Sequence, residues 1–198
     1  MIPTLSIGDI NAILNAKYRG EHRIIGIMLA RYDISLVKDV IAECYSYWHE
    51  NSGRGFDLFW PGYGKHYVDD LIPYRIPLSL PKNANGIFFD SRTFIECKDA
   101  LNKYLKLPYR DKFELLLVNY NVDHIEFDKH IRIDLEKNLD PYFGSIREIM
   151  EFIISQCKIE YDVSSLRNKK IFYDFKKSIK GISVSDAVNI GVNIAQHL

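Results

Sequence analysis

Residues 60–70 hold the densest group of side chains that could do chemistry. Its most useful members are Trp60, Tyr63, Lys65 and His66. An indole and a phenol can stack on a ligand ring, while an ammonium and an imidazole can hold or transfer charge. This set would suit a nucleotide or another small charged ligand. The plainer interpretation is that the two aromatic residues cover the edge of a sheet and the charged groups are solvated, as polar loops usually are.

The elements around this stretch predict where it lies. Residues 23–30 are almost continuously apolar, which is typical of a strand buried on both faces, and residues 56–60 make a second short strand before a proline. Between them we expect a helix with Asp33 or Ser35 as its N-cap and apolar residues at helical spacing as far as Trp48. A strand, a helix and a strand of this length form a right-handed parallel unit.

Ligands of such parallel units collect beyond the carboxyl ends of the strands. We therefore expect the residues that follow the first strand to lie near residues 60–70, together with the end of the next strand along the chain. The candidate ligand-binding residues are Tyr32, Asp33, Trp60, Tyr63, Lys65, His66 and Asp90.

The remaining pattern predicts an α/β fold of three layers with a mixed sheet. The expected elements are a short helix within residues 1–21, a strand at 86–90, a helix at 91–105 capped by Asp90 or Ser91, a doubly buried strand at 113–120, a strand at 124–135 and a helix at 145–157 capped by Ser145. The strand at 124–135 alternates apolar and polar residues, so we expect it to run antiparallel to its predecessor. The two apolar strands, 23–30 and 113–120, should lie side by side at the centre.

Two further segments depart from this regular pattern. Residues 68–85 contain Pro73, Pro77 and Pro81, which exclude a helix and predict an extended insertion of the kind that usually serves as a functional loop or an interface. Lys129 interrupts the alternation of the last strand. We therefore expect a bulge or a hairpin break at residues 128–129, and a sheet edge there.

The C-terminal residues predict helices rather than strands. Residues 163–179 should form one helix and residues 183–198 another that is poor in charge. The side chains expected to be buried in the first are Leu166, Ile171, Phe172 and Phe175. We divide the chain into an α/β domain at residues 1–158 and a helical appendage at residues 159–198, packed on that domain or on a partner.

The order of these elements is similar to that of a thioredoxin-like fold, with the parallel unit first and an antiparallel hairpin last, and with one extra strand before the second helix. At the tip of the first long helix, where a thioredoxin carries its cysteine pair, this chain has Tyr32-Asp33-Ile34-Ser35. Without a thiolate pair to exchange, the resemblance implies no disulfide oxidoreductase activity. The segment that runs from Tyr47-Trp48-His49-Glu50-Asn51-Ser52-Gly53 through Asp57 to Trp60-Pro61-Gly62-Tyr63-Gly64 also resembles a pattern in uncharacterised small proteins of bacterial defence-type gene clusters.

Composition narrows the function classes. Lysine and arginine together number 26, as do aspartate and glutamate, so no overall field draws the protein to nucleic acid or to an anionic membrane. The basic residues between 167 and 180 surround aromatic ones, as on a nucleic-acid surface, yet acidic residues among them favour a solvated helix face. The three cysteines, Cys44, Cys97 and Cys157, have no CxxC spacing and suit the reduced core of a cytoplasmic protein.

The sequence motifs give little indication of a metal-binding or cofactor-binding site. His124, Glu126, Asp128 and His130 stand two residues apart and would share one face of an unbroken strand, but a flat row offers a metal at most neighbouring pairs. The sequence lacks a Walker lysine loop, GxGxxG, GxSxG and HExxH. We therefore expect no metal and no cofactor.

These observations favour a non-catalytic, thioredoxin-like α/β module that acts as a protein-binding accessory subunit. Its partner would be another protein or a second copy of the chain, reached through the proline-rich insertion and the C-terminal helices. The alternative is a nucleotide-binding or small-ligand sensor, or a hydrolase, with its site at residues 31–33, 60–70 and 90.

Overall fold

The computed structural model describes residues 1–51, 53, 55–66, 74–79, 86–105, 111–138, 144–179 and 182–186, and only the backbone at 144–145 and 182–186. In chain order its elements are β1 (Ile2–Thr4), α1 (Ile7–Tyr18), β2 (His22–Leu29), α2 (Ser35–Asn51), β3 (Leu58–Pro61), β4 (Tyr63–Gly64), β5 (Arg75–Pro77), β6 (Phe88–Asp90), α3 (Ser91–Leu105), β7 (Glu114–Asn121), β8 (His124–Asp134), a 3-10 turn (Glu136–Asn138), α4 (Gly144–Cys157), α5 (Val163–Asn168), α6 (Lys170–Ser178) and β9 (Ile182–Asp186).

The main sheet has six strands in the order β1-β3-β2-β7-β8-β9. Strands β2 and β3 are parallel across α2, and β7 and β8 form an antiparallel hairpin, as predicted. The two apolar strands do lie side by side: β2 pairs with β7 over eight residue pairs from His22↔Asn121 to Leu29↔Glu114. The α/β fold with a mixed sheet is therefore confirmed.

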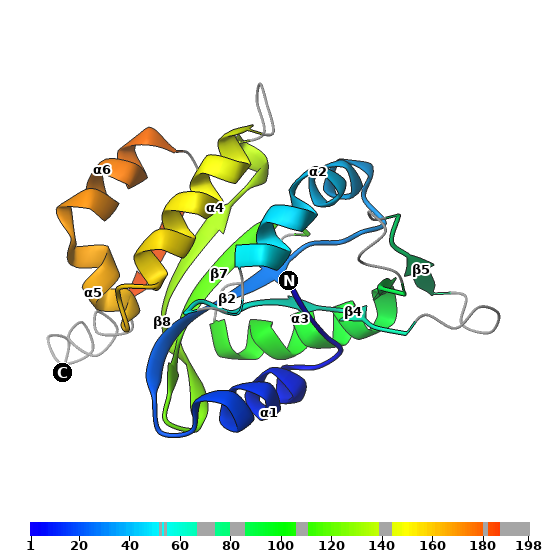
Figure 1. Cartoon of the computed structure of the whole chain (residues 1–198), viewed down its shortest axis with the longest axis horizontal. Coiled ribbons are helices and arrows are strands. Elements are labelled where there is room, and N and C mark those ends of the chain that lie inside the picture. The colour runs from blue at the N-terminus through cyan, green and yellow to red at the C-terminus, as the bar shows by residue number, and fades with distance from the viewer. Residues whose placement is uncertain are drawn as a thin grey trace, which may run out of the picture.

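Helices cover both faces of this sheet (Figure 1). On one face lie α1 and α3; the Tyr120 hydroxyl of β7 donates to Asn15 Oδ1 of α1 at 2.8 Å. On the other face lie α2 and α4, where Trp48 of α2 packs on Trp60 of β3 with ring centroids 5.2 Å apart. The predicted stripe of α4 is buried throughout its described side chains, from Ile146 to Cys157. The result is three layers.

The N-terminal segment adds a strand that the sequence did not reveal. Strand β1 is three residues long and pairs in parallel with β3, with Ile2 opposite Phe59. Helix α1 follows, closed by a capping box in which Ser6 Oγ accepts from the Asp9 backbone and Asp9 accepts from the Ser6 backbone. The predicted first helix is confirmed.

The bulge predicted in the last long strand is present, but the expected sheet edge is not there. Asn119 pairs with Glu126 while its neighbour Val118 pairs with His130, so β8 carries extra residues at 127–129. Beyond it, β9 pairs with β8 in antiparallel register from Lys129↔Asp186 onward. Residues 182–186 therefore form a strand where we expected a helix; residues 187–198 lie outside the described part. Alternating Ile, Ser, Val and Ser suits a strand better than a helix.

The helix expected at residues 163–179 is divided in two. Lys169 has extended backbone angles (φ −76°, ψ 139°), which end α5 and start α6. The break rotates α6, so Phe172 is buried and Phe175 half-buried, while Ile171 is exposed and its predicted burial was wrong. The ring of Phe175 stacks on Phe152 of α4 with a centroid distance of 3.9 Å, and this contact holds α6 on the domain.

A second, three-stranded sheet in the order β4-β6-β5 lies beside the carboxyl end of β3. The chain enters it through Gly62, whose φ is +80°, and Gly62 C=O accepts from the Asp90 backbone at 2.7 Å. A Cβ at this position would lie 2.6 Å from Cβ and 2.9 Å from Cα of Phe94. Both the backbone angle and the close approach of α3 therefore require glycine. Pro73 and Pro81 of the insertion lie outside the described residues.

We predict that Gly62→Ala lowers the free energy of unfolding by about 3 kcal/mol or more, because it adds a backbone clash to the cost of a positive φ. Gly20→Ala is the matched control: its φ is +86°, yet a Cβ there would meet nothing within 4 Å. We expect Gly20→Ala to lower the free energy of unfolding by about 1 kcal/mol. Urea denaturation of both variants measures the difference, and equal losses would contradict the clash.

Candidate functional site

The aromatic candidates lie in the core where the two sheets meet. The ring of Trp60 is fully buried between Trp48 and Tyr63, and the Tyr63 ring continues to Phe89 at a centroid distance of 5.2 Å. The Tyr63 hydroxyl donates to the backbone carbonyl of Ala30, just after β2, at 2.8 Å. Through these buried contacts, Trp60 and Tyr63 join the small sheet to the main one.

Tyr32 and Asp33 lie beyond the carboxyl end of β2, as expected. The Tyr32 side chain is buried, and its hydroxyl accepts from the Ser79 backbone at 3.0 Å, which fixes the described end of the insertion to the start of α2. Both carboxylate oxygens of Asp33 accept from the Arg31 guanidinium, at 3.1 and 2.6 Å. The same guanidinium lies 3.5 Å from Asp111. Asp33 thus neutralises Arg31.

Asp90 is buried and has two partners. Its Oδ1 accepts from the Thr93 backbone at 3.0 Å, so it caps α3 as predicted, and its Oδ2 accepts from Arg75 Nε at 3.0 Å. Burial alone would raise the pKa of this carboxyl, but the hydrogen bonds from Thr93 and Arg75 outweigh it and hold the pKa below its usual value. An ionised, fully paired carboxylate is a structural clamp between the small sheet and α3.

Lys65 and His66 are exposed after β4. His66 has a left-handed backbone with φ +64°, an uncommon conformation for a residue other than glycine. Residues 67–70, the rest of the predicted stretch, lie outside the described part of the chain. The structure thus brings Tyr32, Trp60, Tyr63 and Asp90 to one end of the sheet but buries all four, and places Asp33, Lys65 and His66 at the surface.

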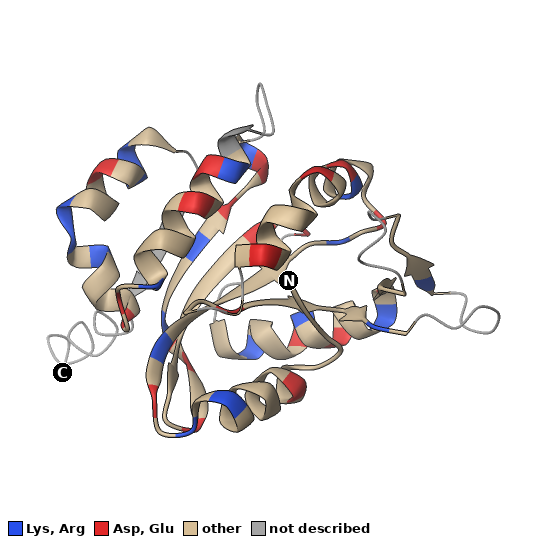
Figure 2. Ribbon diagram, in the orientation of Figure 1, with Lys and Arg blue, Asp and Glu red and all other residues tan. Residues whose placement is uncertain are grey.

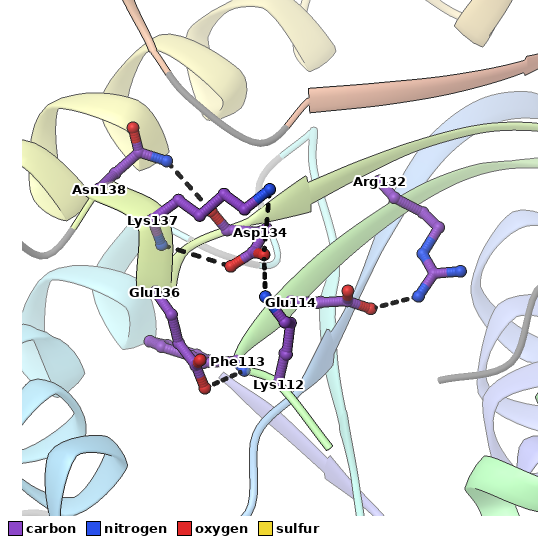
Figure 3. Close-up of polar contacts among 8 residues, drawn as sticks. All are labelled: Lys112, Phe113, Glu114, Arg132, Asp134, Glu136, Lys137 and Asn138. Atoms are coloured by element: carbon purple, nitrogen blue, oxygen red, sulfur yellow. Dashed lines mark hydrogen bonds and ion pairs between the residues drawn. The ribbon is translucent and has the colours of Figure 1, made fainter. Parts of the chain in front are cut away.

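A charged cluster that the sequence reasoning missed occupies the same end of the sheet (Figure 3). It consists of Lys112, Glu114, Arg132, Asp134, Glu136 and Lys137, and we call it the charged edge cluster. Lys112 Nζ lies 2.8 Å from Asp134 Oδ2, and Glu136 accepts from the Phe113 backbone at 2.9 Å. Asp134 acts to raise the pKa of the Lys112 ammonium. The sequence offered one signal for this cluster, which is the presence of charged residues at the ends of two apolar strands.

Three members of this cluster are buried, Glu114, Arg132 and Asp134, and the first two form an ion pair. Its oxygen and nitrogen atoms are 2.6 Å apart and each side chain is 9% exposed. Removing two charges from water costs several kcal/mol, which the pair recovers only by good geometry. Three cations and three anions make up the cluster, so it is electrically neutral. Its cations are engaged by carboxylates within hydrogen-bond or ion-pair distance, which leaves a weak field for an anionic ligand.

His130 lies on the same sheet face as Arg132 and is 2% exposed. Its Nδ1 is 2.9 Å from the Phe127 carbonyl in the bulge, and its Nε2 has no hydrogen-bond partner. Burial is the main cause that lowers the pKa of this imidazole, and the charge of Arg132 acts in the same direction. The side chain is therefore held neutral, with Nδ1 as the donor.

The row of four polar residues on β8 is broken by the bulge. Glu126 pairs with Asn119 and His130 with Val118, so these two side chains point to opposite faces. Glu126 instead accepts from Asn121 at 2.6 Å. Among the described residues, no group of three or more His, Cys, Asp or Glu side chains is placed to hold a metal ion.

The comparisons with known proteins identify no relative. No protein-family model, no curated protein and no solved structure matches this chain. In the described residues, no helix has both the length and the apolar character needed to cross a bilayer.

We predict that Arg132→Met lowers the free energy of unfolding by about 3–5 kcal/mol, because it leaves Glu114 buried and unpaired. Adding Glu114→Gln should restore part of that loss. The control is Arg147→Met, which breaks an exposed pair with Glu151 and should cost about 0.5 kcal/mol or less. A double-mutant cycle by urea unfolding measures the coupling, and additive effects of the two buried substitutions would contradict it.

We predict that His130 makes the fold sensitive to acid. In the folded chain the pKa of His130 is below the ordinary value of 6.5. The contribution of the neutral imidazole to stability is therefore present above pH 6.5. It is lost as the pH falls, because the unfolded chain binds a proton at this residue more readily than the folded chain does. Urea unfolding at about pH 7.5 and about pH 5 should therefore show a smaller pH effect in His130→Gln. His124→Gln is the control of opposite sign, since the hydrogen bond that His124 Nδ1 donates to the Asp123 carboxylate raises the pKa of that exposed imidazole.

Proposed function

We propose that this chain is a non-catalytic, thioredoxin-like α/β module that works as an accessory subunit by binding a partner protein. The resemblance of residues 47–64 to proteins of bacterial defence-type gene clusters would make that partner a component of such a system. The observation that carries the proposal is a set of exposed apolar side chains on the connection between α4 and α5 and on α6.

We call these four side chains the C-terminal patch: Ile159 and Tyr161 lie between α4 and α5, and Ile171 and Tyr173 lie on α6. Each of these side chains is at least half exposed, and they are four of the nine large apolar side chains exposed in the described part of the chain. The other five are spread over four separate places. Tyrosine is enriched in protein interfaces and often dominates their affinity, and grouped exposed apolar side chains commonly mark a binding surface.

The layout of the sheet supports the thioredoxin-like part of the proposal. The strands β3-β2-β7-β8 run parallel, antiparallel and antiparallel, with α3 on one face and α2 and α4 on the other. This is the element order expected from the resemblance in the sequence. At the start of α2, the tyrosine and the aspartate that stand in the place of the cysteine pair are engaged with Ser79 and Arg31.

The thiols support a role without redox chemistry. All three cysteines are buried and unpaired. Burial raises the pKa of Cys44 and of Cys97 to about 11, and it raises the pKa of Cys157 as well. Because the thiolate is the reactive form, these side chains are inert core residues at neutral pH.

The ligand-binding alternative has weaker support. Trp60 and Tyr63 are buried in aromatic contacts, and Asp90 is held by a cap and an ion pair. The charged edge cluster at the same end of the sheet balances its own charges. A nucleotide would need cations that are not already neutralised by carboxylates. The insertion at 67–73 and 80–85 lies outside the described residues and stays part of the hypothesis as a second contact region.

We predict that the C-terminal patch touches another protein in the cells that produce this chain. A photoreactive benzoylphenylalanine in place of Tyr173 should give a discrete cross-linked product, detected on a denaturing gel and identified by mass spectrometry. Tyr104 on α3 is the matched control position, because the two tyrosines are 56% and 57% exposed. Products at both positions, or at neither, would contradict a binding surface at the C-terminal patch.

A further inference from the structure

Tyr173 on α6 has lysines at all of its neighbouring positions on the helix surface. The side chain is 56% exposed, and its neighbours on a helix are the residues three or four positions away. These positions hold Lys169, Lys170, Lys176 and Lys177, which we call the lysine frame. The Tyr173 backbone N–H donates to the Lys169 carbonyl at 3.1 Å, so the helical spacing extends back to that residue.

Three lysines of the frame have charges that a ligand can use. Lys170, Lys176 and Lys177 are exposed and form no ion pair with a carboxylate in the described part of the chain. Figure 2 shows basic positions at both ends of α6 and an acidic position between them. That acidic residue, Asp174, is four positions from Lys170 and three from Lys177, on the side of them turned away from Tyr173. The frame therefore differs from the charged edge cluster, whose cations are engaged by carboxylates.

The stability of α6 explains only half of the lysine frame. Cations in the last turn, Lys176 and Lys177, are favoured by the helix dipole. Lys170 in the first turn is disfavoured by the same dipole, and no acidic residue in that turn offsets it. The N-cap Lys169 makes no side-chain capping bond, and its ammonium bonds to Glu160 instead. The cations at the start of α6 thus need a reason outside the helix.

The ring of Tyr173 lies beside one of the available charges. The Lys177 ammonium is 4.2 Å from the ring centroid, which is a cation–π contact. The tyrosine side chain nevertheless remains more than half exposed. Proteins that bind single-stranded nucleic acids combine cations for the phosphates with exposed aromatic rings on which the bases stack. The outer side of α6 has both.

Going beyond the protein-binding role, we propose that the outer side of α6 binds a single strand of nucleic acid without reading its sequence. One base stacks on Tyr173, and the phosphates before and after it pair with the lysines at the two ends of the helix. Lys170 and Lys177 are about 10 Å apart along the axis, so charge is present on both sides of the ring. The helix has no arginine, asparagine or glutamine, which are the usual readers of base edges.

Other anionic ligands fit this surface less well. Each nucleotide supplies both a phosphate and a flat base, whereas the carboxylates of an acidic protein segment supply charge alone. A duplex keeps its bases paired and stacked on one another, which leaves none for the tyrosine. A helix that lies on a membrane has a broad apolar face. Tyr173 has lysines around it, and Ile171, two positions away, faces another side of the helix.

The test measures binding to the intact chain by fluorescence anisotropy. The fluorescein-labelled probes are an oligouridine, an oligothymidine and a duplex of the same length, with a glutamate peptide as an anion without bases. We expect both single strands to bind at low salt, and the duplex and the peptide to bind at least about tenfold more weakly. Pairing of three lysines with phosphates predicts a slope of about −2 for the logarithm of the binding constant against that of the salt concentration.

Substitutions separate stacking from charge. Tyr173→Ala should weaken binding of the single strands about fivefold or more, whereas Tyr173→Phe keeps the ring and should bind normally. Lys170→Gln combined with Lys177→Gln should make the salt slope shallower by about 1.4. Tyr104→Ala and Lys103→Gln are the matched controls on α3, where Tyr104 is 57% exposed and Lys103 is exposed; neither should change binding. Circular dichroism melting checks that each variant is folded.

Four results would overturn the nucleic-acid proposal: no binding of either single strand at low salt, equal binding of the duplex or the peptide, unchanged binding by Tyr173→Ala, or an unchanged salt slope in the double lysine variant. The protein-binding role is judged separately, by the protein that mass spectrometry identifies after cross-linking at position 173. Failure of the oligonucleotides to bind leaves that role in place. Because both ligands would cover Tyr173, they would bind in turn rather than together.

Discussion

The pairing of β2 with β7 is the constraint on which the rest of the structure depends. Both strands are apolar and covered on both faces, so each buried backbone group must find its partner in the neighbouring strand. On the other side of β2, Gly26 leaves room for the segment that enters β3, since a Cβ there would lie 2.7 Å from the Phe56 ring and 2.9 Å from the Leu58 side chain. With this pair fixed, α1 and α3 can cover one face and α2 and α4 the other.

Much of this fold could be predicted because its patterns are local. The apolar runs of β2 and β7, the alternation of β8 and the helical stripes of α2, α3 and α4 reside in consecutive residues. Features set by distant contacts could not be read in this way. Strand β1 is three residues long and is defined by its pairing with β3, and β9 by its pairing with β8. The break at Lys169 depends on a single pair of backbone angles.

The sequence predicted the location of the candidate site better than it predicted the residues that form it. The carboxyl ends of β2 and β8 do carry a concentration of polar groups, but Glu114, Arg132 and Asp134 supply them from strand ends that the sequence presents as core. Trp60 and Tyr63 were predicted to be available to a ligand because they flank the pair Pro61-Gly62. Their burial follows from the small sheet that folds over them, whose strands β4, β5 and β6 are two or three residues long. Such short pairings leave almost no periodicity.

The position of β9 changes what the C-terminal helices are. The chain leaves the sheet after β8, builds α4, α5 and α6, and then returns to lie along β8. Helices α5 and α6 are thus a loop of the fold anchored at both ends, through Val163 on Asn119 and through β9, rather than a loose tail. A chain cut after residue 158 would leave the long strand β8 with a bare row of amide and carbonyl groups. An exposed border of this kind recruits strands from other molecules, so the returning strand protects β8 from such pairing and makes the five-residue β9 the border of the sheet.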